Sequence, residues 1–459
     1  MRNILDFLNV YFFGPALPII VFCAGAYLFI KFGYTIFKKP SCILKTLFRK
    51  NEKDGISPIK SVVLALASTL GVGNIVGVST AIFCGGAGAV FWLNVSAFAA
   101  MILKYSEVVL AVKYRTVKRG EYRGGAMYYM QECIKSKKLA VLFAFLCITN
   151  ALCVGNVVQI KAVSESLTGM FGINPLYVGI VGCFVIFISI KNGTGRVAEI
   201  TSKIIPIATL SFCALSFYVI SVNSASVPSV VGLVLKEAFN IKALFGGVGG
   251  YSIISALRFG VARGIMSNEA GSGTSPIAHA KTNLQSSVEQ GMFGIFEVFA
   301  DTVLMCNLTA FAVLFSYNEY VLQRGLSGMD LVIAAYGRYA GKFGEYIIII
   351  SVILFAYATV ACQGFYGREC VSFLSEKKGV LNFFTVVYCL FTVYGSVVSS
   401  ELLWSFTDVN VSLMTLINTL CILAASGEIK RDTVLYFAKL KTGAEKPPFE
   451  FCVLKDLKE

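Results

Sequence analysis

The stretch that decides the fold is "LGVGNIVGVST" at residues 70–80, where Gly71, Gly73 and Gly77 interrupt a long apolar run. Its spacing differs from the dinucleotide-binding fingerprint, and no strand followed by a helix frames it. A second run of this kind, "GIMSNEAGSGTSPIAHA" at residues 264–280, carries further glycines and a proline. Irregular backbone at membrane depth must be hydrogen bonded or must line a cavity. Close packing of small residues explains the first stretch alone, but the two together predict two interrupted helices beside a shared cavity.

The composition is that of an integral membrane protein. Of 459 residues, 56% are hydrophobic and only 14% are charged, whereas soluble domains carry ~25% charged residues. The net charge of +14 comes from Lys and Arg in short segments between apolar runs, which indicates cytoplasmic loops rather than nucleic-acid binding. The 14 Cys show no C-x-x-C pair and the chain has 1 His. Neither a zinc site, a disulfide framework nor any other cofactor is therefore expected.

The apolar pattern predicts an all-α membrane domain without a soluble part. About eleven segments approach the ~20 residues needed to cross the hydrocarbon core. They are residues 14–36, 61–84, 87–112, 139–168, 174–191, 203–222, 246–266, 289–316, 344–366, 379–398 and 401–425.

The basic loops orient the chain. Residues 38–60, 113–125 and 191–203 and the Lys-rich tail fall on one side of the membrane, which places them in the cytoplasm and the N-terminus outside. Residues 223–245 and 317–343 would then be external.

Two glycine-interrupted helices in corresponding positions of two oppositely oriented halves are typical of inverted-repeat secondary transporters, which bind substrate near the membrane midplane. Helix-end N–H groups at such a break suit an anionic group such as a carboxylate, and the freed carbonyls suit a cation. The sequence therefore predicts a transporter of a small molecule that carries a carboxylate.

At these residues the chain resembles the sodium:alanine (alanine or glycine:cation) symporters, which have a LeuT-type fold. The resemblance is carried by two long signatures and two short ones, in order along the chain. They are "GVGNIVGVSTAIFCGGAGAVFWLNVSAFAAMILKYSEVVLAVKYR" followed by "GEYRGGAMYYM", then "GNVVQ", "VARGIMSNEAGSGTSPIAHA" followed by "VEQGMFGIFEVFADT", and "YATVACQGFYG".

The resemblance implies two inverted five-helix repeats, at residues 61–222 and 246–425. An extra N-terminal helix at 14–36 would precede them, and a cytoplasmic tail at 426–459 would follow. The whole chain, 1–459, would be one transporter domain, working as a monomer in the cell membrane.

The resemblance also implies a substrate site and a sodium site. The amides of Val72 and Gly73 would face the substrate carboxylate, with Gln159 at its polar end, and Met266 and Gln363 would line the side-chain pocket. The remaining residues implied for the two sites are Asn74 at the substrate, and the carbonyls of Ala67, Leu70 and Phe355 with the Thr359 hydroxyl at Na⁺. Asn268 and Glu269 are expected mainly to hold the second interrupted segment through hydrogen bonds, with substrate contact as the second expectation. Hard oxygen ligands of this kind suit a small hard cation.

Several positions depart from the family pattern. Val72 replaces a usual Thr, Met266 an aromatic residue and Gln363 a Trp. The pocket is thereby larger and more polar, which favours a longer or polar side chain such as that of glutamine or asparagine over alanine. At the ion site Ala358 stands where the family has Ser, which removes one hydroxyl ligand and raises the alternative of proton coupling.

Isolated polar residues complete the prediction. Lys161, two residues after Gln159, is a candidate for ion coupling because ionisable residues within a span are expensive; the alternative is a pair with Glu165 one turn on, or a position in a wet vestibule. His279 is read as a capping or surface residue. Glu107 and Asp301 are expected to hydrogen bond structurally, with gating second.

Other functions remain open at this point. An enzyme needs a nucleophile with its base, paired carboxylates or clustered metal ligands, of which the sequence offers little. A channel also uses broken helices, and a receptor of the transporter type binds its ligand without moving it. Saturable uptake with substrate competition separates a transporter from a channel, and counterflow separates it from a receptor.

Overall fold

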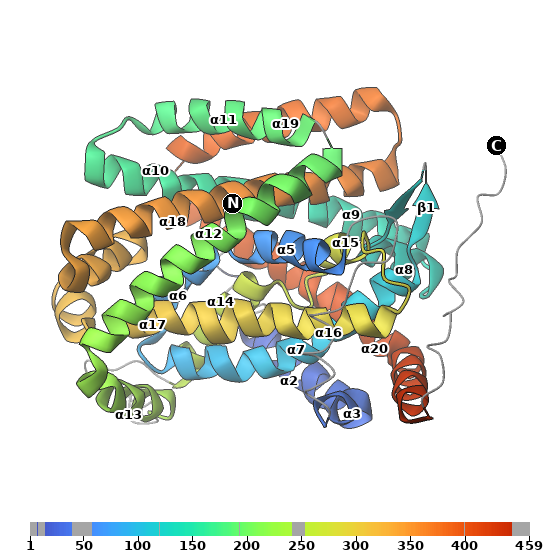
Figure 1. Ribbon diagram of the computed structural model, residues 1–459, viewed down its shortest axis with the longest axis horizontal. Coiled ribbons are helices and arrows are strands. Elements are labelled where there is room, and N and C mark those ends of the chain that lie inside the picture. The colour runs from blue at the N-terminus through green and yellow to red at the C-terminus, as the bar shows by residue number, and fades with distance from the viewer. Residues whose placement is uncertain are drawn as a thin grey trace.

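The computed structural model describes residue 7 and residues 14–38, 57–118, 120–191, 193–240, 253–398 and 400–442. This part of the chain is almost entirely helical, with one antiparallel hairpin of β1 (Thr116–Lys118) and β2 (Glu121–Arg123) (Figure 1). The long helices or helix runs are α2–η2–α3 (Gly14–Phe37), α5 (Pro58–Thr69), η3 (Val72–Asn74), α6 (Val76–Gly85), α7 (Ala89–Lys113), α9–η4–α10 (Lys137–Phe171), α11 (Pro175–Lys191), α12 (Gly193–Val222), α14 (Ile253–Asn268), α16–η7–α17 (Ser287–Leu314), α18 (Gly328–Leu374), α19 (Lys378–Val397) and α20 (Ser400–Thr442).

Among the described residues, eight helices are long and apolar enough to cross a membrane, and α5 with η3 and α6 forms a ninth span if the bent pair counts as one. Each of the predicted apolar segments contains a helix of the structure; residues 246–252 of the seventh segment lie outside the described part. The total of eleven spans and the division into two five-helix repeats stay predictions.

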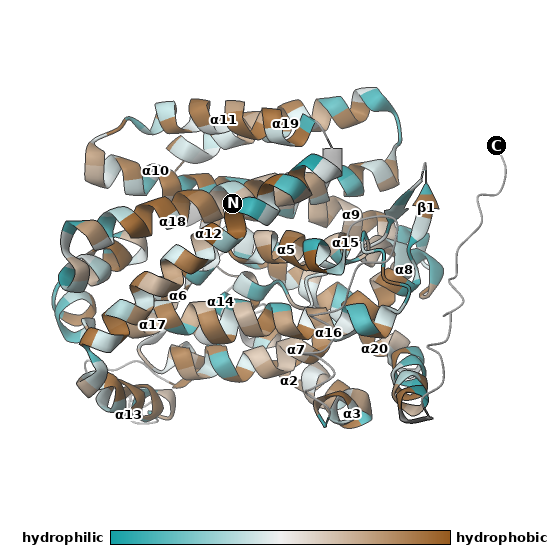
Figure 2. Ribbon diagram, in the orientation of Figure 1, coloured by the Kyte–Doolittle hydropathy of each residue, from teal (hydrophilic) through white to brown (hydrophobic). Residues whose placement is uncertain are grey.

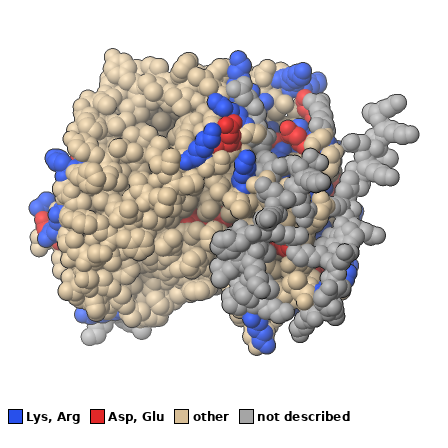
Figure 3. Space-filling model, in the orientation of Figure 1, with Lys and Arg blue, Asp and Glu red and all other residues tan. Residues whose placement is uncertain are grey.

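The outer surface fits a lipid environment. Large apolar side chains on several helices are open to the surroundings, for example Phe184 at 66%, Leu210 at 70% and Phe383 at 70%. Apolar residues dominate the middle of the long helices (Figure 2), and the face in Figure 3 carries a broad band nearly free of charged side chains, with Lys, Arg, Asp and Glu toward its two ends. Soluble proteins rarely expose apolar surface on this scale.

Local signals explain where several helices begin. Pro58 opens α5 after Ser57, whose hydroxyl accepts the Lys60 N–H, and Ser136 and Ser286 cap α9 and α16 in the same way. Such caps satisfy N–H groups that have no partner within the helix.

Besides η2 (Phe29–Gly33) in the first span, two spans of the described chain contain a π-helical segment in mid-course. The first, η4 (Cys153–Val157), joins α9 (Lys137–Leu152) to α10 (Val158–Phe171); the second, η7 (Phe299–Cys306), joins α16 (Ser287–Val298) to α17 (Asn307–Leu314). π-helical turns occur frequently at functional sites; η7 contacts both η3 and α14, and η4 leads into α10, which carries Gln159.

The segment 317–343, predicted to be an external loop, is largely helical, and its external position stays a prediction. Residues 317–323 form the π-helix η8 (Tyr317–Gln323), and α18 begins at Gly328 with a sharp bend at Gly341, where φ is +58°. The charges that lowered the hydropathy are accommodated in ion pairs, since Arg338 binds Glu319 and Lys342 binds Glu345.

Two further segments are more helical than expected. The segment 223–245 contains the short helix α13 (Val227–Ala238), and the predicted tail begins as a continuation of α20, which extends to Thr442. That extension is packed, because Tyr436 is buried and its hydroxyl donates to Glu289 Oε1 at 2.9 Å.

The interior positions the interrupted helices. α5 lies against α12 and α18, and α7 packs between α14 and α16. The short helix α15 (Pro276–His279), which follows the second interruption, contacts both α5 and α7. The two interruptions therefore lie inside the helix bundle rather than at its lipid-facing surface.

Candidate functional site

The first interruption bends the span by 59° between α5 and η3–α6. Gly71 lies at the break, and a Cβ added there would come within 2.8 Å of Thr359 Oγ1 and 2.9 Å of Gln159 Oε1. Residue 71 must be glycine because the side chains of α18 and α10 approach its backbone directly. The opening glycine pattern thus marks the point where three helices meet.

Backbone N–H groups at this break are bound by amide side chains. The Val72 N–H donates to Gln159 Oε1 at 2.9 Å, and the Gly71 N–H donates to Asn74 Oδ1 at 3.2 Å. The structure therefore brings Gln159 to the interruption, as the sequence predicted, and gives the Val72 amide a protein acceptor. Contact of Val72 and Gly73 with a substrate carboxylate stays a prediction.

The second interruption follows α14. Glu269 adopts a left-handed conformation with φ +53°, and Gly271 and Gly273 have φ +79° and +78°. A non-glycine residue in this conformation is uncommon and costs free energy, which must be offset by other contacts. The Glu269 side chain makes those contacts: it accepts hydrogen bonds from Thr274 Oγ1 at 2.6 Å and from Gln363 Nε2 at 2.5 Å.

Gln363 is the residue of α18 that meets the second interruption. Its Nε2 binds Glu269, and its Oε1 is buried and has no hydrogen-bond partner among the described residues. Its Cβ lies where a side chain on Gly155 of η4 would be. A buried acceptor without a donor is costly, so it suits a ligand that brings an N–H or O–H group. Met266, the other predicted pocket residue, is 9% exposed and accepts a contact from Arg263.

The predicted sodium ligands lie between α5 and α18. The Thr359 hydroxyl donates to the Ala67 carbonyl at 3.0 Å, Phe355 is buried one turn before Thr359, and Leu70 ends α5. One turn further along, Cys362 Sγ donates to the Leu64 carbonyl at 3.0 Å. Two oxygen atoms of the predicted set are thus adjacent, and they are hard donors of the type that Na⁺ prefers.

Asp301 of η7 joins the two interruptions. Its Oδ1 accepts from Asn74 Nδ2 at 2.7 Å, and its Oδ2 accepts from Ser267 Oγ at 2.8 Å. The prediction of structural hydrogen bonding for Asp301 is therefore confirmed.

The neighbouring Asn268 donates to Thr302 Oγ1 at 3.0 Å and accepts the Ala270 N–H at 2.9 Å, so its amide is used within the protein. Substrate contact by Asn74 and Asn268 stays a prediction.

A buried charged cluster packs against the second interruption and is hydrogen bonded to it. Lys104 of α7 is fully buried; its Nζ donates to Ser275 Oγ at 2.5 Å and lies 3.5 Å from both Glu107 Oε1 and Glu297 Oε1. His279 binds Glu297 at 2.8 Å. Glu107 also accepts the Gly273 N–H at 3.2 Å, which confirms its structural role. This cluster holds the irregular backbone of 269–275 in place.

Sequence reasoning missed part of this cluster. The prediction that His279 lies in a capping or surface position is wrong as to the surface, because the side chain is fully buried between Glu297 and Gln290. Lys104 and Glu297 were not singled out. The available signal was a lysine in the middle of the long apolar run of α7, since an ionisable residue within a span is a functional candidate by default.

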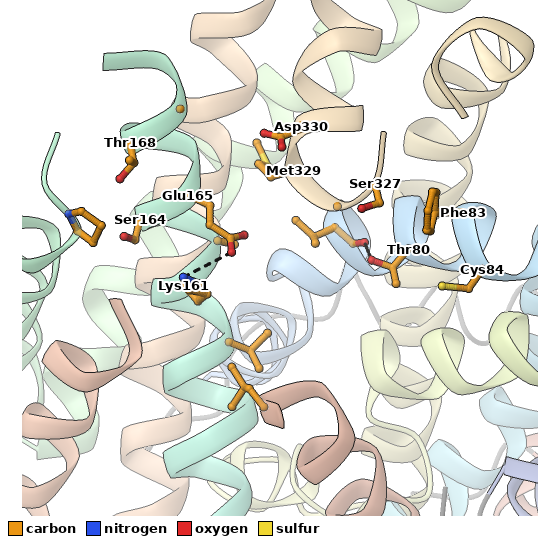
Figure 4. Close-up of a pocket in the computed structure, with 17 residues that line it drawn as sticks. Thr80, Phe83, Cys84, Lys161, Ser164, Glu165, Thr168, Ser327, Met329 and Asp330 are labelled. Carbon is orange, nitrogen blue, oxygen red and sulfur yellow. Dashed lines mark hydrogen bonds and ion pairs between the residues drawn. The ribbon is translucent and has the colours of Figure 1, made fainter. Parts of the chain in front are cut away.

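A cavity of about 830 Å³ adjoins the first interruption. It is lined by α6, α10 and the start of α18, and Lys161 faces it beside Glu165, with 3.6 Å between Nζ and Oε1 (Figure 4). Two alternatives to a coupling role were expected for Lys161, an ion pair with Glu165 and a position in a wet vestibule. The structure shows both, because Lys161 pairs with Glu165 one turn on and also lines an open cavity. A role of Lys161 in coupling stays a prediction.

Comparisons with known proteins agree with this geometry. The family model described as "Sodium:alanine symporter family" matches residues 1–451. The sodium/alanine symporter AgcS of Methanococcus maripaludis is 30% identical over 94% of this chain and 96% of its own, and the probable sodium/glutamine symporter GlnT of Bacillus subtilis is 29% identical over 99% and 95%. In fold, the chain is similar to MhsT in complex with L-phenylalanine, with a TM-score of 0.58, 12% identity, and coverage of 84% of this chain and 99% of MhsT. That likeness indicates the LeuT fold.

Proposed function

Since the chain belongs to the sodium:alanine symporter family, we propose that it is a secondary active transporter that imports a small neutral amino acid together with Na⁺ by alternating access. The family is described as one of symporters, and the proposal assigns the chain no enzymatic activity. The single observation that carries the proposal is the meeting of three helices at Gly71, where irregular backbone lies against Thr359 and Gln159 inside the bundle.

The substrate proposal follows from this site. The amino acid carboxylate binds at the Val72 and Gly73 amides, with Asn74, Gln159 and Asn268 as polar contacts, in the place where Gln159 now accepts the Val72 N–H. Substrate arrival would displace Gln159 from that amide. A helix N-terminus with free N–H groups favours an anionic group in this way.

The side-chain specificity rests on Gln363 and Met266. The buried, unpartnered Gln363 Oε1 favours a substrate whose side chain donates a hydrogen bond, such as glutamine or asparagine. A relative named as a probable sodium/glutamine symporter is consistent with this choice. Replacing Gln363 by Trp should fill the pocket and shift the preference from glutamine to alanine, whereas Gln363→Leu should lower glutamine uptake without improving alanine uptake.

The coupling ion is proposed to be Na⁺, bound by the carbonyls of Ala67, Leu70 and Phe355 and by the Thr359 hydroxyl. The contact of Thr359 with Ala67 supports this set. Proton coupling is the second candidate, because Ala358 offers no hydroxyl and Lys161 with Glu165 supplies a titratable pair next to the cavity.

The remaining proposals concern the arrangement of the protein. We place residues 61–222 and 246–425 as two inverted repeats, with the N-terminus outside, the C-terminus in the cytoplasm and a monomer as the working unit. Cysteine labelling from each side of a sealed vesicle tests the orientation.

The decisive experiment measures uptake of labelled glutamine and alanine into proteoliposomes with an inward Na⁺ gradient, an inward H⁺ gradient, or neither. Saturable uptake that needs Na⁺ supports the proposal, and uptake driven by H⁺ alone favours the second candidate. Binding without counterflow indicates a receptor, and uptake that never saturates indicates a channel. Competition by alanine but not by glutamine would refute the proposed specificity.

A further inference from the structure

A small pocket lies where the β1–β2 hairpin meets the ends of four membrane-spanning helices. It has a volume of about 170 Å³ and is lined by β2, by the end regions of α11 and α18 and by the start regions of α12 and α19. The hairpin lies at one end of the bundle (Figure 1), and the predicted orientation puts that end in the cytoplasm. The pocket is therefore at the expected cytoplasmic boundary of the membrane, apart from the large cavity beside Lys161.

Two arginines from different elements line this pocket. Arg123 comes from β2, and Arg368 comes from α18. Arg123 Nη1 donates to Ser372 Oγ at 2.5 Å, and Ser372 lies four residues after Arg368 on the same helix. Because residues four apart lie on one face of a helix, the two guanidinium groups face the same small volume.

Neither arginine has a carboxylate partner in the part of the chain that the structure describes, since no ion pair found there includes Arg123 or Arg368. Arg368 Nη1 donates to Thr385 Oγ1 at 3.3 Å, and Arg123 Nε is buried without an acceptor among the described residues. A buried N–H of a charged group without an acceptor is costly. Both side chains therefore have donors that suit a ligand with acceptor oxygens.

The two carboxylates of the pocket are engaged by a lysine. Lys281 Nζ lies 3.1 Å from Glu369 Oε1 and 3.7 Å from Glu121 Oε2. Glu376, which follows the end of α18, binds Lys118 at 2.8 Å and so has a cation of its own. Lys281 and the two arginines against two carboxylates leave the pocket with one excess positive charge.

The excess charge and the place of the pocket favour a phosphate group. Planar guanidinium groups bind phosphate oxygens through two N–H groups at once. The volume is smaller than the ~300–1,000 Å³ of pockets that enclose a whole drug-sized ligand, so it suits a small charged group. The helices that line the pocket also expose apolar side chains such as Ile188 and Phe383, which places lipid headgroups at the same depth.

We propose that this pocket binds a phosphate group between Arg123 and Arg368, supplied by the headgroup of an anionic phospholipid or by free phosphate. The phosphate oxygens accept from Arg123 Nε and from the remaining donors of Arg368. The bound group links the β1–β2 hairpin to α18 and stabilises the folded chain. The inference does not depend on the proposed function, because it concerns binding and stability and not transport.

The test measures the thermal unfolding midpoint of the detergent-purified full chain with phosphatidylglycerol, phosphatidylcholine or inorganic phosphate, at matched ionic strength. A ligand that binds only the folded chain raises the midpoint, by about 5 °C at 100 times its dissociation constant. We expect phosphatidylglycerol or inorganic phosphate to give a saturating rise in the wild type. Arg123→Gln and Arg368→Gln, each compared with its own ligand-free midpoint, should lose at least half of that rise.

Arg196→Gln is the matched control. Arg196 lies near the start of α12, on the same expected side of the membrane; it pairs with Glu199 at 3.5 Å and does not line the pocket. This variant removes the same charge, so a general attraction of anions to a basic surface would weaken equally in all three variants. Arg368→Lys keeps the charge without the planar fork and replaces a glutamine variant that does not purify as a single species; it should lose part of the rise.

The three ligands distinguish the sources of the phosphate. A rise with phosphatidylglycerol alone assigns the pocket to a lipid headgroup, and a rise with inorganic phosphate assigns it to the free ion. Three outcomes overturn the inference. They are no rise with either ligand in the wild type, a rise that the pocket variants retain in full, and a rise that Arg196→Gln reduces as much as the pocket variants do.

Discussion

Replacing Lys104 by Met tests the buried cluster, because it removes one charge and keeps most of the side-chain volume. The Lys104 Nζ lies 3.5 Å from each of two fully buried carboxylates, those of Glu107 and Glu297. At an effective dielectric constant of about 20, each contact corresponds to about 5 kcal/mol of Coulomb energy. Removal of one partner from a buried pair typically costs about 3–5 kcal/mol after relaxation, and we expect the upper end because two carboxylates lose their counter-charge.

The assay is thermal unfolding of the detergent-purified protein, followed by loss of the monodisperse peak in size-exclusion chromatography. About 3–5 kcal/mol should lower the midpoint by roughly 6–10 °C, at about 2 °C per kcal/mol for a chain of this size. The double variant Lys104→Met with Glu297→Gln removes one of the two stranded charges, those of Glu107 and Glu297, and should recover about half of the loss. A shift below about 2 °C, or a double variant whose loss equals the sum of the two single losses, would refute the reasoning.

Three further predictions concern the interruptions. Thr359→Val removes the hydroxyl that contacts the Ala67 carbonyl and should raise the Na⁺ concentration for half-maximal uptake about tenfold or more, given ~1.5–3 kcal/mol for a contact to a charged group; an unchanged Na⁺ dependence would remove Thr359 from the ion site. Gly71→Ala places a Cβ within 2.8 Å of Thr359 and should abolish amino acid binding in a protein that still elutes as a sharp peak; normal binding would contradict the close approach. Asp301→Asn replaces a charged acceptor by a neutral one and should lower uptake about fivefold or more while a radiolabelled ligand still binds; weaker binding with normal turnover would instead place Asp301 at the substrate.

Much of the fold was predictable because it depends on local sequence. Apolar runs of membrane-spanning length coincide with helices, and the two glycine-rich stretches coincide with the two interruptions. Gln159 and Thr359 lie at the first interruption, and their contacts with substrate and Na⁺ stay predictions. In these cases the sequence pattern reflects the structural requirement directly. At Gly71, for example, the helices approach so closely that only a residue without a side chain fits.

The remaining features depend on contacts between distant segments. The cluster around Lys104 combines α7, α15 and α16. Glu107 is a partner of Lys104 on its own helix, but Glu297 and His279 come from segments far along the chain, and the sequence alone does not show that they meet Lys104. The same holds for Glu269, whose strained backbone is balanced by Gln363 from α18. The hydropathy pattern predicted a loop over 317–343 for a related reason. The charged side chains there lower the hydropathy, but they form ion pairs with one another within a largely helical segment.

The π-helical segment η4 makes the effect of a one-residue deletion depend on where the deletion falls. A π turn holds one residue more than an α-helical turn, so deletion of one residue from Cys153–Val157 would convert the wide turn into a regular one and leave Gln159 on nearly the same face of the span. Deletion of one residue from the regular turns of α9 would instead rotate the residues that follow by about 100° and move them by about 1.5 Å relative to the start of the span. Gln159 would then leave the Val72 amide, although its codon would be intact. The wide turn is therefore the one place in this span where the chain can change its length by one residue and keep the face that carries Gln159.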